Sequence, residues 1–105
     1  MSESDRRQSR RVSYFIEARL EGIDVGRSDV RIADLSPDGA FVDARTVLPV
    51  GTIARLHFAI DSTEVSVLVE VRYSMVGFGM GVRFIDVDDA TRRMLNSAIA
   101  QRIGS

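Results

Sequence analysis

The stretch that decides the fold is VSVLVEVRY, residues 65–73, in which every second residue is valine until the final tyrosine. An alternation with a period of two places its apolar side chains on one face of a β-strand. Stretches with a weaker form of this alternation lie on both sides of it, at residues 13–20, 30–34, 40–43, 52–60 and 80–85. The sequence therefore predicts about six short strands, which the turns between them make antiparallel.

Glycine and proline mark the turns between these stretches. The second stretch breaks at residues 35–39, LSPDG, where Pro37 removes a backbone donor and Gly39 permits a positive φ. Residues 48–51, LPVG, have proline and glycine placed as in a type II turn. Residues 76–79, VGFG, turn the chain before the last predicted strand.

The apolar spacing changes from strand-like to helical after residue 88. Five apolar residues then fall on one helical face: Met94, Leu95, Ala98, Ile99 and Ile103. Asp88 is placed to cap a helix N-terminus, and Asp89 lies in the first turn, where the helix dipole favours negative charge. We predict a helix over residues 89–103 that covers an open end or side of the sheet.

Together these elements predict a mainly β fold, a small antiparallel barrel of six to seven strands (a split barrel) with one C-terminal α-helix. A chain of 105 residues has room for one domain with one modest core, which we assign to residues 12–105. Residues 1–11 contain no aliphatic residue after Met1. Because they have little apolar surface to bury, we expect them to form a flexible arm.

Composition excludes several kinds of chemistry. The chain has no cysteine and a single histidine, His57, which excludes disulfides, thiolate sites and metal sites built from several histidines. No apolar run approaches the roughly 20 residues of a membrane span, and the polar N-terminus has no apolar signal core. We therefore expect a cytoplasmic protein without membrane insertion, metal or cofactor.

The charges are unevenly distributed along the chain. All 14 basic residues are arginine, against 15 acidic residues, for a net charge of -1. Residues 1–11 hold four arginines and two acids, so the predicted arm is cationic while the rest of the chain is mildly acidic. A compact cationic segment on an acidic body favours a local anionic partner over general coating of nucleic acid.

No group of residues favours an enzyme. His57 lies in the middle of a predicted strand on the face opposite its apolar neighbours, which is typical of a histidine at a barrel rim. The helix N-terminus explains the acidic pair Asp88 and Asp89. Residues 77–81, GFGMG, lack the strand-to-helix crossover of a phosphate-binding loop and are typical of a hairpin with a close backbone approach.

Two clusters together supply what a guanine nucleotide requires: the arginines of residues 6–11 and the segment DLSPDG, residues 34–39. An arginine side chain donates a bidentate fork to guanine O6 and N7 or to phosphate, and its plane stacks on a base. A carboxylate such as Asp34 accepts from guanine N1–H and N2–H. The Ser36 hydroxyl adds a short hydrogen bond, and a glycine lets the backbone approach the ligand.

With both clusters in this order on a β-rich frame, the sequence resembles the PilZ domain, a bacterial receptor for cyclic di-GMP. The family pattern begins with Arg-x-x-x-Arg and an apolar residue, matched by Arg7, Arg11 and Val12. Its second motif, Asp/Asn-x-Ser-x-x-Gly, is matched by Asp34, Ser36 and Gly39. Arg6 and Arg10 are also four residues apart, so they form an alternative register of the first motif.

The resemblance extends from about Arg6 to Arg102 and includes GVRF, residues 81–84, as the closing strand. It implies a cyclic di-GMP site formed by the two motifs and Gly81. An arginine directly before the first motif, here Arg6, goes with binding of a stacked cyclic di-GMP dimer in such domains.

The resemblance also implies a mechanism and a partner. The arm would fold over the ligand, and the changed surface would regulate an effector protein that the sequence does not identify. Two alternatives remain: a PilZ-like adaptor that binds only protein, and a barrel that binds single-stranded nucleic acid. The second is less favoured because the body is acidic and only Phe15 and Phe78 are expected to be exposed aromatics.

Overall fold

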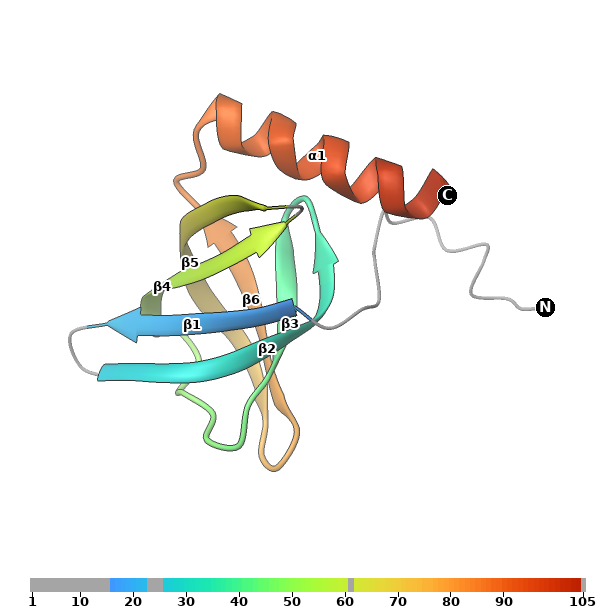
Figure 1. Cartoon of the computed structure of the whole chain (residues 1–105). Helices are drawn as coiled ribbons and strands as arrows, with labels where there is room; N and C mark the ends of the chain where they lie inside the picture. The colour runs from blue at the N-terminus through green and yellow to red at the C-terminus, as the bar shows by residue number, and fades with distance from the viewer. Residues whose placement is uncertain (1–15, 23–25, 61, 105) are drawn as a thin grey trace.

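The computed structural model describes residues 16–22, 26–60 and 62–104. It contains six strands and one helix, which are β1 (Ile16–Gly22), β2 (Gly26–Ser36), β3 (Gly39–Asp43), β4 (Ile53–Ile60), β5 (Thr63–Met75), β6 (Gly79–Ile85) and α1 (Asp89–Gly104). The predicted mainly β fold with one C-terminal helix is confirmed (Figure 1). The start of the first predicted strand, at residues 13–15, lies outside the described residues.

The strands form a closed antiparallel barrel in the order β1-β2-β3-β6-β5-β4, with β1 pairing with β4 to close it. Alternate residues of each strand point inward, as the period of two predicts. In β4 and β5 this places the predicted apolar set in the core: Ala54, Leu56, Phe58, Ile60, Val65, Val67, Val69 and Val71. Closure leaves no unpaired sheet edge among the described strands.

A β-bulge in β2 changes which side chains face outward near the end of that strand. The register against β3 shifts between Ile32 and Asp34, so that Asp34 pairs with Phe41 and Leu35 with Ala40. A bulge inserts one extra residue and reverses the alternation after it. Leu35 is therefore buried, with 1% of its surface exposed, and β2 continues to Ser36. The predicted break at residues 35–39 is wrong in extent, since only two residues separate β2 from β3.

A second bulge, in β5, shifts the register against β6 between Val71 and Tyr73. The extra residue is Arg72. The alternation predicted for residues 65–73 holds as far as Val71 and is wrong for Tyr73, which is 51% exposed on the outer surface. Each bulge thus turns outward a side chain that strict alternation places in the core, and the two bulged strands flank β3 and β6.

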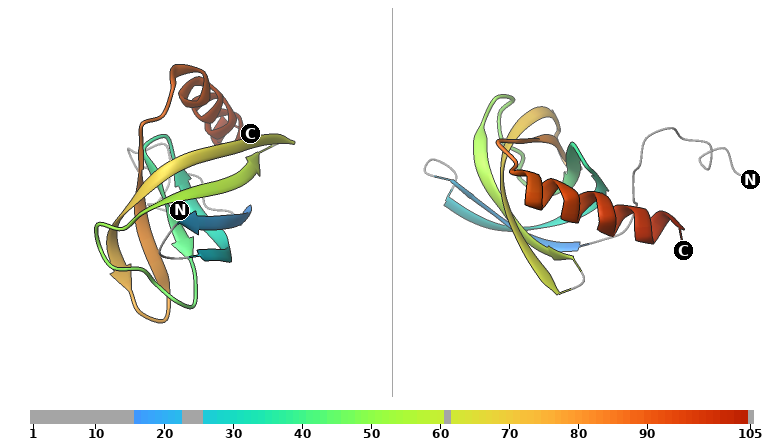
Figure 2. Two further views of the ribbon diagram at one scale, coloured as in Figure 1. Left: turned by 90° about the vertical axis from the view of Figure 1, so that its left-hand side faces the viewer. Right: turned by 90° about the horizontal axis from the view of Figure 1, so that it is seen from above.

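The helix α1 lies across one end of the barrel (Figures 1 and 2). Leu95, Ala98 and Ile99 are buried in the barrel core, as their helical spacing predicts. The predicted cap at Asp88 is confirmed, because the Thr91 backbone N–H donates to Asp88 Oδ1 at 2.7 Å. That hydrogen bond holds the pKa of the Asp88 carboxyl below its ordinary value of 3.8. Within the described part of the chain, no helix is long and apolar enough to cross a membrane.

The glycines of the turns fulfil two different requirements. Gly51 and Gly77 have φ values of 95° and 87°, so a turn is confirmed near each predicted position. The hydrogen bonds from Thr52 N–H to the Pro49 carbonyl and from Phe78 N–H to the Met75 carbonyl place these turns at 49–52 and 75–78, each one residue from the predicted 48–51 and 76–79. Gly39 is not among the residues with positive φ, contrary to expectation. A Cβ at Gly39 would instead collide with the backbone carbonyl of Val82, so this glycine is required for the close pairing of β3 with β6.

Candidate ligand-binding site

The outer face of β2, β3, β6 and β5 carries two parallel rows of cross-strand neighbours. The first row, between the two bulges, is Asp34, Phe41, Gly81 and Tyr73. The second row, one step nearer the β2–β3 turn, is Ser36, Gly39, Arg83 and Glu70. Cross-strand neighbours on one face of a sheet are close enough for their side chains to interact. Residues far apart in the sequence therefore share one surface.

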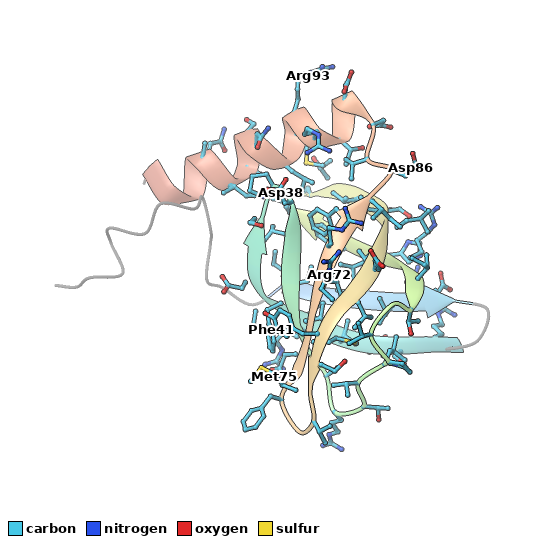
Figure 3. The ribbon with its side chains drawn as sticks, turned by 180° about the vertical axis from the view of Figure 1, so that it is seen from behind. Asp38, Phe41, Arg72, Met75, Asp86 and Arg93 are labelled. Carbon is cyan, nitrogen blue, oxygen red and sulfur yellow. The ribbon has the colours of Figure 1, made fainter. Side chains whose placement is uncertain are left out.

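Most of these residues line a hollow of about 330 Å³, which holds groups of several chemical kinds. Its lining comprises Asp34, Leu35, Ser36, Asp38, Gly39, Ala40, Phe41, Arg72, Tyr73, Gly81, Val82 and Arg83. Figure 3 shows Phe41 and Arg72 on the side of the barrel turned to the viewer, with Asp38 at the end nearer α1. The hollow thus combines carboxylates, a hydroxyl, aromatic rings and guanidinium groups.

Asp34 and Ser36 supply the polar groups of the β2 side. Asp34 is half-buried and is directed outward by the β2 bulge. The Ser36 hydroxyl donates to the backbone carbonyl of Gly39 at 3.2 Å, which closes the β2–β3 turn. Because its proton is used there, the hydroxyl oxygen presents acceptor lone pairs. Both side chains are therefore suited to accept hydrogen bonds from a ligand N–H.

Two glycines of β6 make room for the aromatic rings. A Cβ at Gly81 would collide with the Tyr73 ring, and one at Gly79 would lie within 3.0 Å of the Phe41 ring. The two rings themselves have centroids 6.3 Å apart, tilted by 30°. The close approach predicted for the backbone of residues 77–81 is confirmed. The groups that lie against Gly79 and Gly81 include the rings of Phe41 and Tyr73. Tyr73 presents an exposed aromatic surface at the β5 end of the row that begins with Asp34.

The far side of the hollow is cationic. Arg83 Nη2 donates to Glu70 Oε1 at 3.0 Å, and Arg72 Nη1 lies 3.8 Å from the same oxygen. The Arg72 and Arg83 side chains are 57% and 52% exposed, whereas that of Glu70 is 28% exposed. The guanidinium groups therefore cover the carboxylate and face solvent. A weaker ion pair at 3.8 Å joins Asp38 to Arg92 of α1 at the edge of this surface.

The remaining polar cluster lies on the opposite side of the barrel. His57 Nε2 is 2.8 Å from Glu21 Oε1, which pairs β4 with β1, and His57 faces outward as its strand position predicts. The nearby hollow of about 530 Å³ is larger but is bordered by the carboxylates Glu17, Asp29 and Glu64. Among the residues that the structure describes, no group of three or more His, Cys, Asp or Glu side chains could hold a metal ion.

The structure brings four of the predicted site residues into one hollow: Asp34, Ser36, Gly39 and Gly81. The other three, Arg6, Arg7 and Arg11, lie outside the described residues. The hollow also contains Phe41, Arg72, Tyr73 and Arg83, which neither sequence motif includes. For Phe41 and Tyr73 the sequence does contain a signal, the glycines at 79 and 81. Two glycines at this spacing share one face of a strand and leave space for rings from neighbouring strands.

Comparison with known proteins gives one family and several solved structures. The PilZ domain family matches residues 5–101. The PilZ domain with c-di-GMP of YcgR from Escherichia coli has a TM-score of 0.72 at 17% identity, over 91% of this chain and 90% of that chain. MotI/DgrA, the Bacillus subtilis inhibitor of motility, has a TM-score of 0.74 at 13% identity, over 95% of this chain. This chain covers 52% of the MotI/DgrA chain. No curated protein matches.

The family match covers nearly the whole chain and agrees with the barrel, the closing helix and the surface that gathers the second motif. The chain belongs to the PilZ domain family. The resemblance inferred from the two motifs is confirmed at the level of the family. Because the sequence identities to the solved structures are low, the similarity to them shows the fold alone.

Proposed function

We propose that this chain is a non-catalytic receptor for cyclic di-GMP, with residues 12–105 as the receptor domain and residues 1–11 as an arm that closes over the ligand. The observation that carries the proposal is the convergence of Asp34, Ser36 and Tyr73 in one open hollow. This set matches a guanine base, which offers N–H donors on one edge and a flat face for stacking.

Guanine recognition follows from the chemistry of Asp34 and Tyr73 in the first row and of Ser36 in the second. The Asp34 carboxylate accepts from N1–H and N2–H, and the Ser36 oxygen accepts a further N–H. The Tyr73 ring provides a stacking surface, and stacking of a base on an aromatic ring contributes about 1–3 kcal/mol. Solved structures that share this fold were determined in complex with c-di-GMP, including those of YcgR from Escherichia coli and of PlzA from Borreliella burgdorferi.

The first described residue of the chain lies near the candidate site in the sheet. Ile16, the first described residue, pairs with Ile32, two residues from Asp34. Arg11 precedes Ile16 by five residues, a length that spans at most about 18 Å when extended. We propose that Arg7 and Arg11 pair with the phosphates and guanine edges of a ligand bound beside Asp34.

Isothermal titration calorimetry with the purified chain tests the proposal. We expect binding of cyclic di-GMP at tens of micromolar protein, and a loss of at least about tenfold in affinity for Asp34→Ala, as for other hydrogen bonds to charged groups. Asp43→Ala is the matched control, because Asp43 is an outward carboxylate of β3 that does not line the hollow. Absence of heat with the wild-type chain would refute the function.

The same titration tests which arginines of the arm contribute to binding. Arg7→Ala and Arg11→Ala should weaken binding at least about tenfold, whereas a larger loss in the pair Arg6→Ala and Arg10→Ala would favour the other register. A ligand-to-protein ratio near two would support a stacked dimer held with Arg6. A ratio near one would remove that role.

We propose that the output is the rearranged arm and the surface it creates, read by an effector protein in the cytoplasm. Trypsin cleaves after arginine, so an arm that closes over the ligand should be cut more slowly when cyclic di-GMP is present. An unchanged cleavage rate at saturating ligand would contradict the closing step while leaving the binding proposal intact.

A further inference from the structure

The second row of the site places a motif residue next to an arginine that neither motif contains. Gly39 pairs with Arg83 on β6, and Arg83 pairs in turn with Glu70 on β5. In this row Gly39 lies between Ser36 and Arg83. Because Gly39 has no side chain, it does not separate the side chains of Ser36 and Arg83. The β5 bulge adds Arg72 to the same lining.

The contacts of these arginines leave them able to bind an anion. The hydrogen bond to Glu70 uses one of the five N–H donors of Arg83, and the approach of Arg72 to Glu70 is longer, at 3.8 Å. One carboxylate therefore faces two guanidinium groups, and the three side chains together carry a net positive charge. Both guanidinium groups are more than half exposed and line the hollow that also contains Asp34 and Ser36.

We infer that Arg72 and Arg83 form a phosphate-binding subsite on β5 and β6, with Glu70 as the residue that positions them. The inference rests on the proposed function and assigns to these residues one phosphodiester of the cyclic dinucleotide. A planar guanidinium matches two oxygens of such a group, which a neutral side chain does not.

The experiment compares Arg72→Gln and Arg83→Gln with Arg55→Gln. Arg55 is the matched control because it is an exposed arginine on the outer face of β4, bound to Ser66 Oγ at 3.2 Å and absent from the hollow. Cyclic di-GMP affinity is measured by calorimetry at low and at high salt. We expect Arg83→Gln to weaken binding about tenfold and Arg72→Gln severalfold, each with a smaller dependence on salt than the wild type. Arg55→Gln should bind as the wild type does.

The outcomes separate this subsite from the function on which it rests. If the wild type binds and Asp34→Ala does not, but both subsite variants bind as the wild type, the subsite is refuted and the receptor function stands. Equal losses in Arg55→Gln and Arg83→Gln would also refute the subsite, since they would show a general effect of charge. If the wild type does not bind, the receptor function fails and the subsite fails with it.

Discussion

Two outer faces of the barrel carry the same kind of charge cluster, a carboxylate shared by several bases. On the β1–β4 side, Glu21 is 2.8 Å from His57 and 3.7 Å from Arg27. On the β5–β6 side, Glu70 is 3.0 Å from Arg83 and 3.8 Å from Arg72. Charge alone therefore does not distinguish the candidate site from an ordinary barrel surface.

The two faces differ in what surrounds the cluster. Beside Glu70, the outward positions of β3 and β6 include glycines, and the space they leave is bordered by the rings of Phe41 and Tyr73. Near Glu21, the larger hollow is lined by carboxylates together with Arg19 and His57, its described lining includes no glycine, and the phenyl ring of Phe58 there is buried. Glycines next to the exposed ring of Tyr73 and the half-buried ring of Phe41, more than arginines or the size of the hollow, thus mark the surface suited to a nucleotide.

The largest effect should come from filling the glycine that holds this face together. Gly39→Ala places a methyl group against the Val82 carbonyl, so β3 and β6 must separate. We expect the free energy of unfolding to fall by about 3 kcal/mol, at the upper end for overpacking. Gly26→Ala, in the β1–β2 hairpin, adds a methyl group that has no neighbour within 4 Å, and its only strain is the positive φ of 68°. It should lower the free energy of unfolding by about 1 kcal/mol. Urea denaturation compares them, and equal losses would contradict the steric argument.

Gly81→Ala should separate binding from stability on the same face. The added methyl group meets the ring of Tyr73, an exposed side chain that can rotate away, so we expect a loss of about 1 kcal/mol or less in stability. Displacing the ring removes a stacking surface, which should weaken cyclic di-GMP binding about tenfold. Tyr73→Ala should show the same loss in calorimetry. Full affinity in both variants would exclude Tyr73 from the ligand contacts.

The sequence was sufficient to predict the strands, the helix and its cap, because each depends on local periodicity or on a single side chain. It was not sufficient to predict the outward position of Tyr73 or the burial of Leu35. Both depend on bulges, where one extra residue reverses the alternation, and residues 65–73 contain no local signal for that reversal.

Prediction of the site was limited in the same way. Asp34, Ser36 and Gly39 are close in sequence and could be recognised as a motif. Arg83 and Tyr73 join them only through cross-strand pairing with Gly39 and Gly81, a register that a single sequence does not specify. The role expected for Gly39 also changed, from a positive φ to a close contact between strands.

A smaller effect should come from neutralising the shared carboxylate on each face. Glu70→Gln keeps a hydrogen-bond acceptor for Arg83 but removes a negative charge beside the proposed phosphate position. We expect cyclic di-GMP to bind about three- to fivefold more tightly, the size expected for one screened charge at this range. Glu21→Gln, the equivalent change beside His57, should leave affinity unchanged. An equal change in both variants would mean that the two faces do not differ in this respect.

The smallest effect concerns α1, which contacts the candidate face through Arg92 and Asp38. Because the hydrogen bond from Thr91 lowers the pKa of Asp88 in the folded chain, the ionised cap stabilises the fold above the ordinary pKa of 3.8, and this contribution is lost as the pH falls below that value. Thermal unfolding followed by circular dichroism should therefore show Asp88→Ala less stable than the wild type at pH 6, with a smaller difference near pH 3. Asp88→Asn retains an acceptor without a titrating charge, so its stability should lack this contribution to the pH dependence. A difference between wild type and Asp88→Ala that stays constant across this range would show that the charge of Asp88 does not contribute to the cap.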